Sequence, residues 1–192
     1  MINARWLLII FTLLLAGCAS HPDTSSQAQA WLKPGVRVSL PTPRLNEKLD
    51  QQQLLTGTVD GKQQSLLVLL NANGQTLQLA GLSPLGIRLF KVLYDSSGIH
   101  TEQTINIAQL PPANQVLADI MLSYWPINRW QPLLPAGWKL VDQGAQRVLF
   151  DESGLAVTQI DYVTENGKRQ PVAITQHVFH YHIAIKNVGD GE

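Results

Sequence analysis

Short segments in which apolar and polar residues alternate follow one another along most of this chain. After the first 35 residues they cover 36–40, 53–59, 65–70, 76–79, 87–94 and 99–107. Residues that favour turns, such as the pairs Asp60-Gly61 and Asn73-Gly74, separate them. Strands spaced about ten residues apart and bounded by Gly, Asn or Asp are typical of an antiparallel meander.

One segment in the middle of the chain has a helical period instead. It follows Pro111-Pro112 and its apolar stripe consists of Ala113, Val116, Leu117, Ile120, Met121 and Tyr124. Asp119 and Ser123 fall off that stripe. Proline suits the first turn of a helix, and Pro126 would end it. The pattern predicts an amphipathic helix over 113–124 that packs one face against the sheet.

The rest of the chain returns to strands after an irregular stretch. Residues 125–138 contain three of the five tryptophans, which we interpret as core residues, with a binding rim as the alternative. Strands are predicted at 139–141, 147–150, 156–163 and 172–188. Many strands, one helix and many strands again predict a mainly β fold, in which a curved antiparallel sheet or open half-barrel is covered by a helical lid.

The amino terminus reads as an export signal. Arg5 precedes an apolar run, residues 6–15, that is too short to cross roughly 30 Å of hydrocarbon as a helix. Ala16-Gly17-Cys18 then resembles the lipobox of bacterial lipoproteins. This resemblance implies cleavage before Cys18, acylation of that cysteine with fatty acids such as palmitate, and attachment to a membrane. We therefore expect a signal peptide (1–17), a lipidated flexible tether (18–30) and one domain (31–192).

Composition narrows the classes of partner. The formal net charge is zero, so the chain has no field that would attract nucleic acid. Charged residues make up 15% of the chain, well below the usual quarter, while the hydrophobic share of 45% is ordinary. With so few charged side chains, some apolar side chains must lie at the surface of the protein. They could line a cavity or contact a membrane.

Residues with catalytic or metal-binding chemistry form no convincing constellation. His177, His180 and His182 would point to two faces of one strand, so three ligands could not converge, and we predict no metal site and no cofactor. Ser83 precedes a proline and lacks the spacing of a nucleophile elbow, so a turn is favoured over a nucleophile. The pair Asp151-Glu152 and Glu165 lie beside glycines and are interpreted as solvated turn residues.

Two families resemble this layout. The lipobox, the meander, the turn Pro84-Leu85-Gly86 and the central helix resemble the LolA/LolB family of lipoprotein carriers and receptors. The stretch 79–90, with Tyr94-Asp95, Leu117-Ala118-Asp119 and Tyr124-Trp125-Pro126, is similar to uncharacterised lipoproteins encoded with aryl-polyene and fatty-acid-like biosynthesis genes. Inner-membrane lipoproteins carry an Asp directly after the lipidated cysteine, whereas this chain has Ala19. The two resemblances and Ala19 together imply an outer-membrane lipoprotein that faces the periplasm.

The resemblance also implies a function and a site. Proteins of this type hold acyl chains in an apolar half-barrel, and LolB uses an exposed leucine in a turn, comparable to Leu85, to deliver cargo into the membrane. Leu85 could instead fold back onto the sheet. Alternation and the helical stripe predict these cavity walls: Phe90, Tyr94, Leu117, Met121, Tyr124, Trp125, Phe179 and Tyr181.

We expect a non-enzymatic protein that binds or transfers an acyl lipid, a polyene lipid or a lipoprotein acyl chain. A periplasmic carrier protein is a candidate partner. Two alternatives stay open: a hydrolase of lipid or acyl esters, and an assembly lipoprotein that contacts a protein partner.

Overall fold

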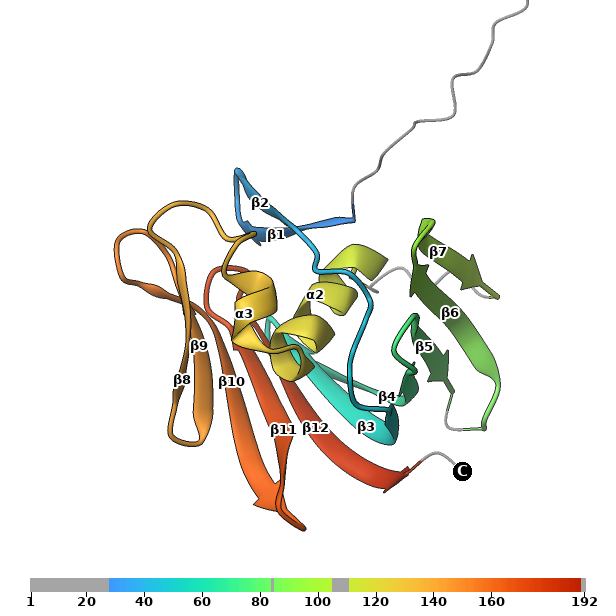
Figure 1. Cartoon of the computed structure of the whole chain (residues 1–192). Helices are drawn as coiled ribbons and strands as arrows, with labels where there is room; N and C mark the ends of the chain where they lie inside the picture. Colours follow the sequence, from blue (N-terminus) through green and yellow to red (C-terminus); the bar gives the residue numbers. More distant parts are fainter. Residues whose placement is uncertain (1–27, 84, 105–110, 191–192) are drawn as a thin grey trace, which may run out of the picture.

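A computed structural model describes residues 28–83, 85–104 and 111–190 of the chain, and its dominant element is one antiparallel sheet (Figure 1). The ten strands lie in the order β7-β6-β5-β4-β3-β12-β11-β10-β9-β8. Their bounds are β3 (Leu49–Val59), β4 (Lys62–Ala72), β5 (Leu77–Leu82), β6 (Arg88–Asp95), β7 (Gly98–Gln103), β8 (Lys139–Gln143), β9 (Gln146–Phe150), β10 (Ala156–Glu165), β11 (Lys168–Gln176) and β12 (Tyr181–Asp190). The sheet curves but does not close into a barrel, which confirms the predicted fold class.

Tight turns set the register of the long hairpins. Asp60 and Gly61 both have positive φ, 49° and 74°, which matches the right-handed twist of β3 and β4. Asn166 and Gly167 do the same between β10 and β11. Because cross-strand partners share a face, these registers decide which side chains of the central strands face the concave side.

Helix α2 (Ala113–Tyr124) has the bounds that the sequence predicts and lies on the concave side of the sheet (Figure 1). It is enclosed more fully than the pattern predicts. Asp119 and Ser123, which fall off the apolar stripe, are both 5% exposed. The short helix α3 (Ile127–Trp130) and the hairpin of β1 (Gln29–Lys33) and β2 (Val36–Ser39) cover the side of α2 that faces away from the sheet.

The structure corrects two other expectations, the start of the domain and the last strand, and it decides the place of the tryptophans. The domain begins before residue 31, because β1 starts at Gln29 and Ala30 is 1% exposed. The predicted strand 172–188 is two strands joined by a turn, in which His180 has a φ of 55°. The tryptophans of residues 125–138 are core residues, as favoured: Trp125, Trp130 and Trp138 are at most 3% exposed.

The predicted signal peptide, the lipobox with Cys18 and most of the tether lie outside the described residues. Among the helices that the structure describes, none is long and apolar enough to cross a bilayer.

Candidate functional site on the concave face of the sheet

Five of the eight predicted wall residues lie deep in the core between α2 and the sheet. They are Phe90, Tyr94, Leu117, Met121 and Trp125, each at most 7% exposed. Phe90 illustrates the packing, because its ring lies over Gly81 of β5, where even an added methyl group would overlap it. These side chains belong to one hydrophobic core, to which α2 contributes Leu117 and Met121 and the sheet contributes Phe90 and Tyr94.

The other three predicted wall residues are half-buried and have different surroundings. Phe179 lies in the turn between β11 and β12, so its predicted place on a strand is wrong. Tyr181 begins β12, and its hydroxyl donates a hydrogen bond to Oδ2 of Asp119 at 2.6 Å. The hydroxyl of Tyr124 donates to Oε1 of Gln51 at 2.6 Å.

Asp119 is the most unusual group in the interface between α2 and the sheet. Its Oδ1 has no hydrogen-bond partner among the residues that the structure describes, although Asp119 is only 5% exposed. Burial raises the pKa of this carboxyl to about 7, against the opposing effect of the Tyr181 hydroxyl and the nearby Gln115 amide. Each buried polar group without a hydrogen-bond partner costs about 1–3 kcal/mol. The unpaired oxygen of Asp119 therefore weakens the packing of α2 against the sheet.

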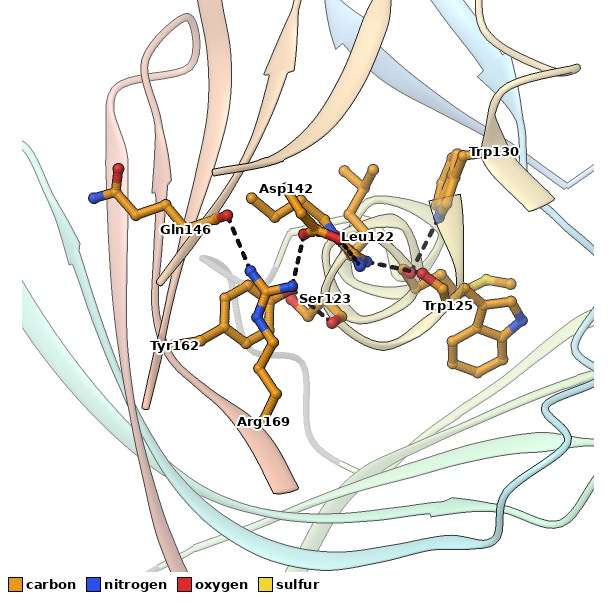
Figure 2. Close-up of polar contacts among 10 residues, drawn as sticks. Leu122, Ser123, Trp125, Trp130, Asp142, Gln146, Tyr162 and Arg169 are labelled. Atoms are coloured by element: carbon orange, nitrogen blue, oxygen red, sulfur yellow. Dashed lines mark hydrogen bonds and ion pairs between the residues drawn. The ribbon is translucent and has the colours of Figure 1, made fainter. Parts of the chain in front are cut away.

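The carboxyl end of α2 is held by side chains from three other elements (Figure 2). The indole of Trp130 donates to the carbonyl of Met121 at 3.1 Å, and the hydroxyl of Tyr162 donates to that of Ser123 at 2.7 Å. One nitrogen of the Arg147 guanidinium donates to the carbonyls of Leu122 and Trp125. The last carbonyls of a helix lack intrahelical partners, so the bonds to Leu122, Ser123 and Trp125 satisfy groups that burial would otherwise penalise. The carbonyl of Met121 also accepts the backbone N–H of Trp125 at 2.9 Å, so the Trp130 bond is its second.

Asp142 of β8 fixes the two arginines beside this helix end. It accepts two hydrogen bonds from Arg147, at 2.9 and 3.1 Å, and one from Arg169 at 2.6 Å. Burial opposes ionisation of Asp142, but the two arginines outweigh it and hold its pKa below the usual value. The guanidinium of Arg169 also stacks on the ring of Tyr162, 3.7 Å from its centre. We call Arg147, Tyr162 and Trp130 the helix clamp.

A chain of amide side chains lies next to the clamp on β3, β11 and β12. Nε2 of Gln53 lies within hydrogen-bond distance of Gln51, Tyr124 and Asn187, and Nε2 of Gln51 donates to Gln170 at 2.8 Å. Gln51 and Gln53 are 6% and 4% exposed. This network makes part of the concave face polar, whereas the face formed by β4, β5 and β6 is apolar.

A cleft of about 1090 Å³ opens beside these groups, at the carboxyl end of α2. The segment before β3, both helices and the hairpin of β10 and β11 contribute its walls. Most of its lining side chains are polar, and Tyr124 is the one predicted wall residue among them. The cleft is thus a polar site that borders the core, and the sequence did not predict it.

Comparison with known families places most of these features in one matched segment of the chain. One family model matches residues 50–189, which include nearly all of the ten-stranded sheet and both helices. The chain belongs to this family, described as Protein of unknown function (DUF3261). No curated protein matches the chain. The DUF3261 region contains the clamp, the amide network and Asp119, whereas the hairpin of β1 and β2 lies before it.

The turn between β5 and β6, also within the DUF3261 region, exposes two apolar side chains. Leu85 is 86% exposed and Ile87 is 55% exposed, so Leu85 does not fold back onto the sheet. Oγ of Ser83 accepts hydrogen bonds from the backbone N–H groups of Leu85 and Ile87, at 3.3 and 3.2 Å. Ser83 therefore shapes the turn, as the sequence favoured.

The remaining candidate residues lie apart from one another. His177 and His180 are exposed in the turn after β11, and exposed His182 contacts Thr175 at 3.0 Å. No group of three His, Cys, Asp or Glu residues in the described part of the DUF3261 chain is placed to hold a metal ion. Asp151 accepts hydrogen bonds from the turn residue Ser153, the largest of the effects that hold its pKa low.

Proposed function

We propose that this protein is an outer-membrane lipoprotein, anchored through Cys18, that binds or transfers a hydrophobic cargo between its open sheet and α2. The cargo would be an acyl or polyene lipid or the acyl chain of a lipoprotein. The single observation that carries the proposal is the seat of α2: one short helix covers the apolar concave face of a sheet that does not close. A cargo chain would take the place of that helix.

The free energy that α2 gains by packing on the sheet is similar to the free energy that a buried acyl chain would gain there. Leu117, Met121, Leu122 and Trp125 are buried against the sheet and neighbouring elements, and each contributes about 1.5–3 kcal/mol, or roughly 6–12 kcal/mol together. An acyl chain with about a dozen methylenes gains about 10 kcal/mol from burial. A long chain therefore offsets the loss of the helix contacts, whereas a chain with six methylenes, at about 5 kcal/mol, does not.

The way α2 is held suggests how it would move. Four carbonyls at its carboxyl end accept side-chain hydrogen bonds, whereas at its amino end the described residues supply one bond to another element, from the Asn114 amide to the carbonyl of Gln29. In its middle, Asp119 has an oxygen that no described residue hydrogen-bonds. We therefore expect the helix to pivot on its carboxyl end, with the amino end moving away from the sheet.

Hydrogen exchange on the full lipoprotein, purified from its host membrane, tests the proposal. Adding palmitate should raise exchange in the peptide that covers 113–124 and leave exchange in the β3–β4 hairpin unchanged. Octanoate at the same concentration is the matched control and should have no effect.

Three outcomes would contradict the carrier. Unchanged exchange in 113–124 with saturating palmitate would show that the helix is fixed. Turnover of acyl esters would indicate a hydrolase. Native mass spectrometry that finds a protein partner and no lipid on the purified protein would favour an assembly role.

A further inference from the structure

We infer that the cleft at the carboxyl end of α2 binds a phosphate-bearing, anionic headgroup. The assignment of that headgroup to the cargo lipid rests on the proposed function. Recognition of the phosphate itself rests on the cleft alone.

The charges around the cleft are unevenly distributed. Six basic residues line it: Arg44, Lys48, Arg129, Arg147, Lys168 and Arg169. Three acidic residues line it: Glu47, Asp50 and Glu165. The whole chain, in contrast, has equal numbers of basic and acidic residues. The excess of cations in one concave site favours an anionic ligand, because a cleft with an excess of one charge raises the local concentration of the opposite charge.

Three of these cations have no carboxylate partner among the described residues. Arg44 and Lys168 make no ion pair there, and Arg129 donates a hydrogen bond to the hydroxyl of Thr42 at 2.6 Å. They come from the segment before β3, from α3 and from the start of β11. In contrast, Arg147 and Arg169 are held by Asp142.

Unpaired cations on separate walls suit a group that carries several anionic oxygens. Arginine matches the oxygens of phosphate with two parallel hydrogen bonds, and lysine adds a point charge. Amide side chains of Asn128, Gln170 and Asn187 also line the cleft and supply neutral donors for a polyol. A phosphate ester of a polyol, such as a phosphoglycerol headgroup, fits this set.

The cleft borders the hydrophobic core, which suits a ligand that carries both a phosphate and an apolar chain. Leu45, Leu49 and Tyr124 line the cleft, and the same side chains belong to the hydrophobic core or pack on it. A headgroup held by the cations would therefore place its acyl chain at the edge of the core, next to the end of α2. At about 1090 Å³ the cleft is slightly larger than the roughly 300–1,000 Å³ of most small-molecule sites, so it has room for a headgroup.

Two lysolipids with the same palmitoyl chain separate the contribution of the headgroup from that of the chain. We expect the full-length protein to bind lysophosphatidylglycerol at least tenfold more tightly than lysophosphatidylcholine in 50 mM salt. The triple variant R44Q/R129Q/K168Q should bring the two affinities within twofold of each other. The matched control K62Q/K139Q/K186Q removes three exposed charges outside the cleft and should keep the tenfold preference.

The outcomes distinguish the two proposals. Equal binding of both lysolipids to the wild type, or a preference that survives in the cleft variant, overturns the headgroup site and leaves the carrier standing. If neither lysolipid binds but glycerol 3-phosphate does, and the cleft variant loses that binding, phosphate recognition stands and the carrier fails. Absence of binding by all three probes overturns both.

Discussion

The raised pKa of Asp119 makes the stability of the folded protein depend on pH. The folded protein keeps its proton up to about pH 7, whereas the unfolded chain releases it near the ordinary value of 3.8. Between these values the folded state binds more protons, so stability falls as pH rises. The carboxylate that forms at higher pH is buried with one oxygen unpaired.

Replacing Asp119 with Asn should remove this dependence. The wild type should lose on the order of 4 kcal/mol of unfolding free energy between pH 4 and pH 8, at about 1.36 kcal/mol for each unit of pKa shift. Asp119→Asn should be nearly flat across that range in urea titrations. Asp60→Asn, in an exposed turn, is the control and should keep the wild-type slope. A variant at 119 that keeps the slope would assign it to another group.

The sequence contains part of the signal for these buried polar residues. Leu49, Gln51, Gln53 and Leu55 alternate on one face of β3, so two amides share a face with apolar residues. That pattern could have indicated a polar patch inside the fold. The residues that cover this patch are about 70 positions or more away in the sequence, as Tyr124 is from Gln53. The alternation of residues along a strand does not identify such distant partners.

At the scale of elements, α2 depends on the strands that grip its carboxyl end. Arg147 reaches it from β9 and Tyr162 from β10, both on the far side of the sheet order from β4, β5 and β6. The clamp therefore ties the helix to one half of the sheet, while the apolar half contributes packing.

Replacing Arg147 with Met should show how much the clamp stabilises the fold. The change leaves the buried carbonyls of Leu122 and Trp125 without this donor and separates Asp142 from one partner, which costs about 2–4 kcal/mol. Urea unfolding measures the loss. Arg88→Met, which removes an exposed ion pair with Glu102, should change stability by less than about 0.5 kcal/mol. Equal effects of the two substitutions would show that the clamp contributes nothing particular.

Elements with a strong local pattern were predictable, and those set by one backbone conformation were not. The apolar stripe and flanking prolines of α2 identify it without reference to the rest of the chain. The break between β11 and β12 depends on the left-handed conformation of His180 in a run of strand-forming residues. Few residues other than glycine adopt this conformation, although histidine does so more often than most, so the run of strand-forming residues favoured one continuous strand.

At the scale of the molecule, the exposed turn of Leu85 and Ile87 lies at one end of β5 and β6, away from the clamp and its strands β9 and β10 (Figure 1). In the carrier proposal this turn would enter the bilayer while the cargo stays under α2. Binding and delivery would then depend on different residues.

Leu85→Glu should therefore impair delivery and spare cargo binding. Losing the burial of one leucine costs about 1.5–3 kcal/mol, which lowers vesicle association roughly ten- to hundredfold. Transfer of a fluorescent fatty acid from the protein to vesicles measures the effect. Leu155→Glu changes a leucine that is 68% exposed in the turn before β10 and should leave transfer unchanged. Loss of fatty-acid binding in Leu85→Glu would contradict the separation.

Among the described residues, β7 and β8 are the first and last strands of the open sheet, and no described strand pairs with their outer edges. Unpaired edges of this kind invite strand addition by other copies. In β7 the outer residues are His100, Thr101, Glu102 and Gln103, all exposed, and β8 carries Lys139 and Asp142. Hydrated and charged rims of this kind discourage stacking into aggregates. The sheet can thus stay open, with two edge strands, and still resist polymerisation through those edges.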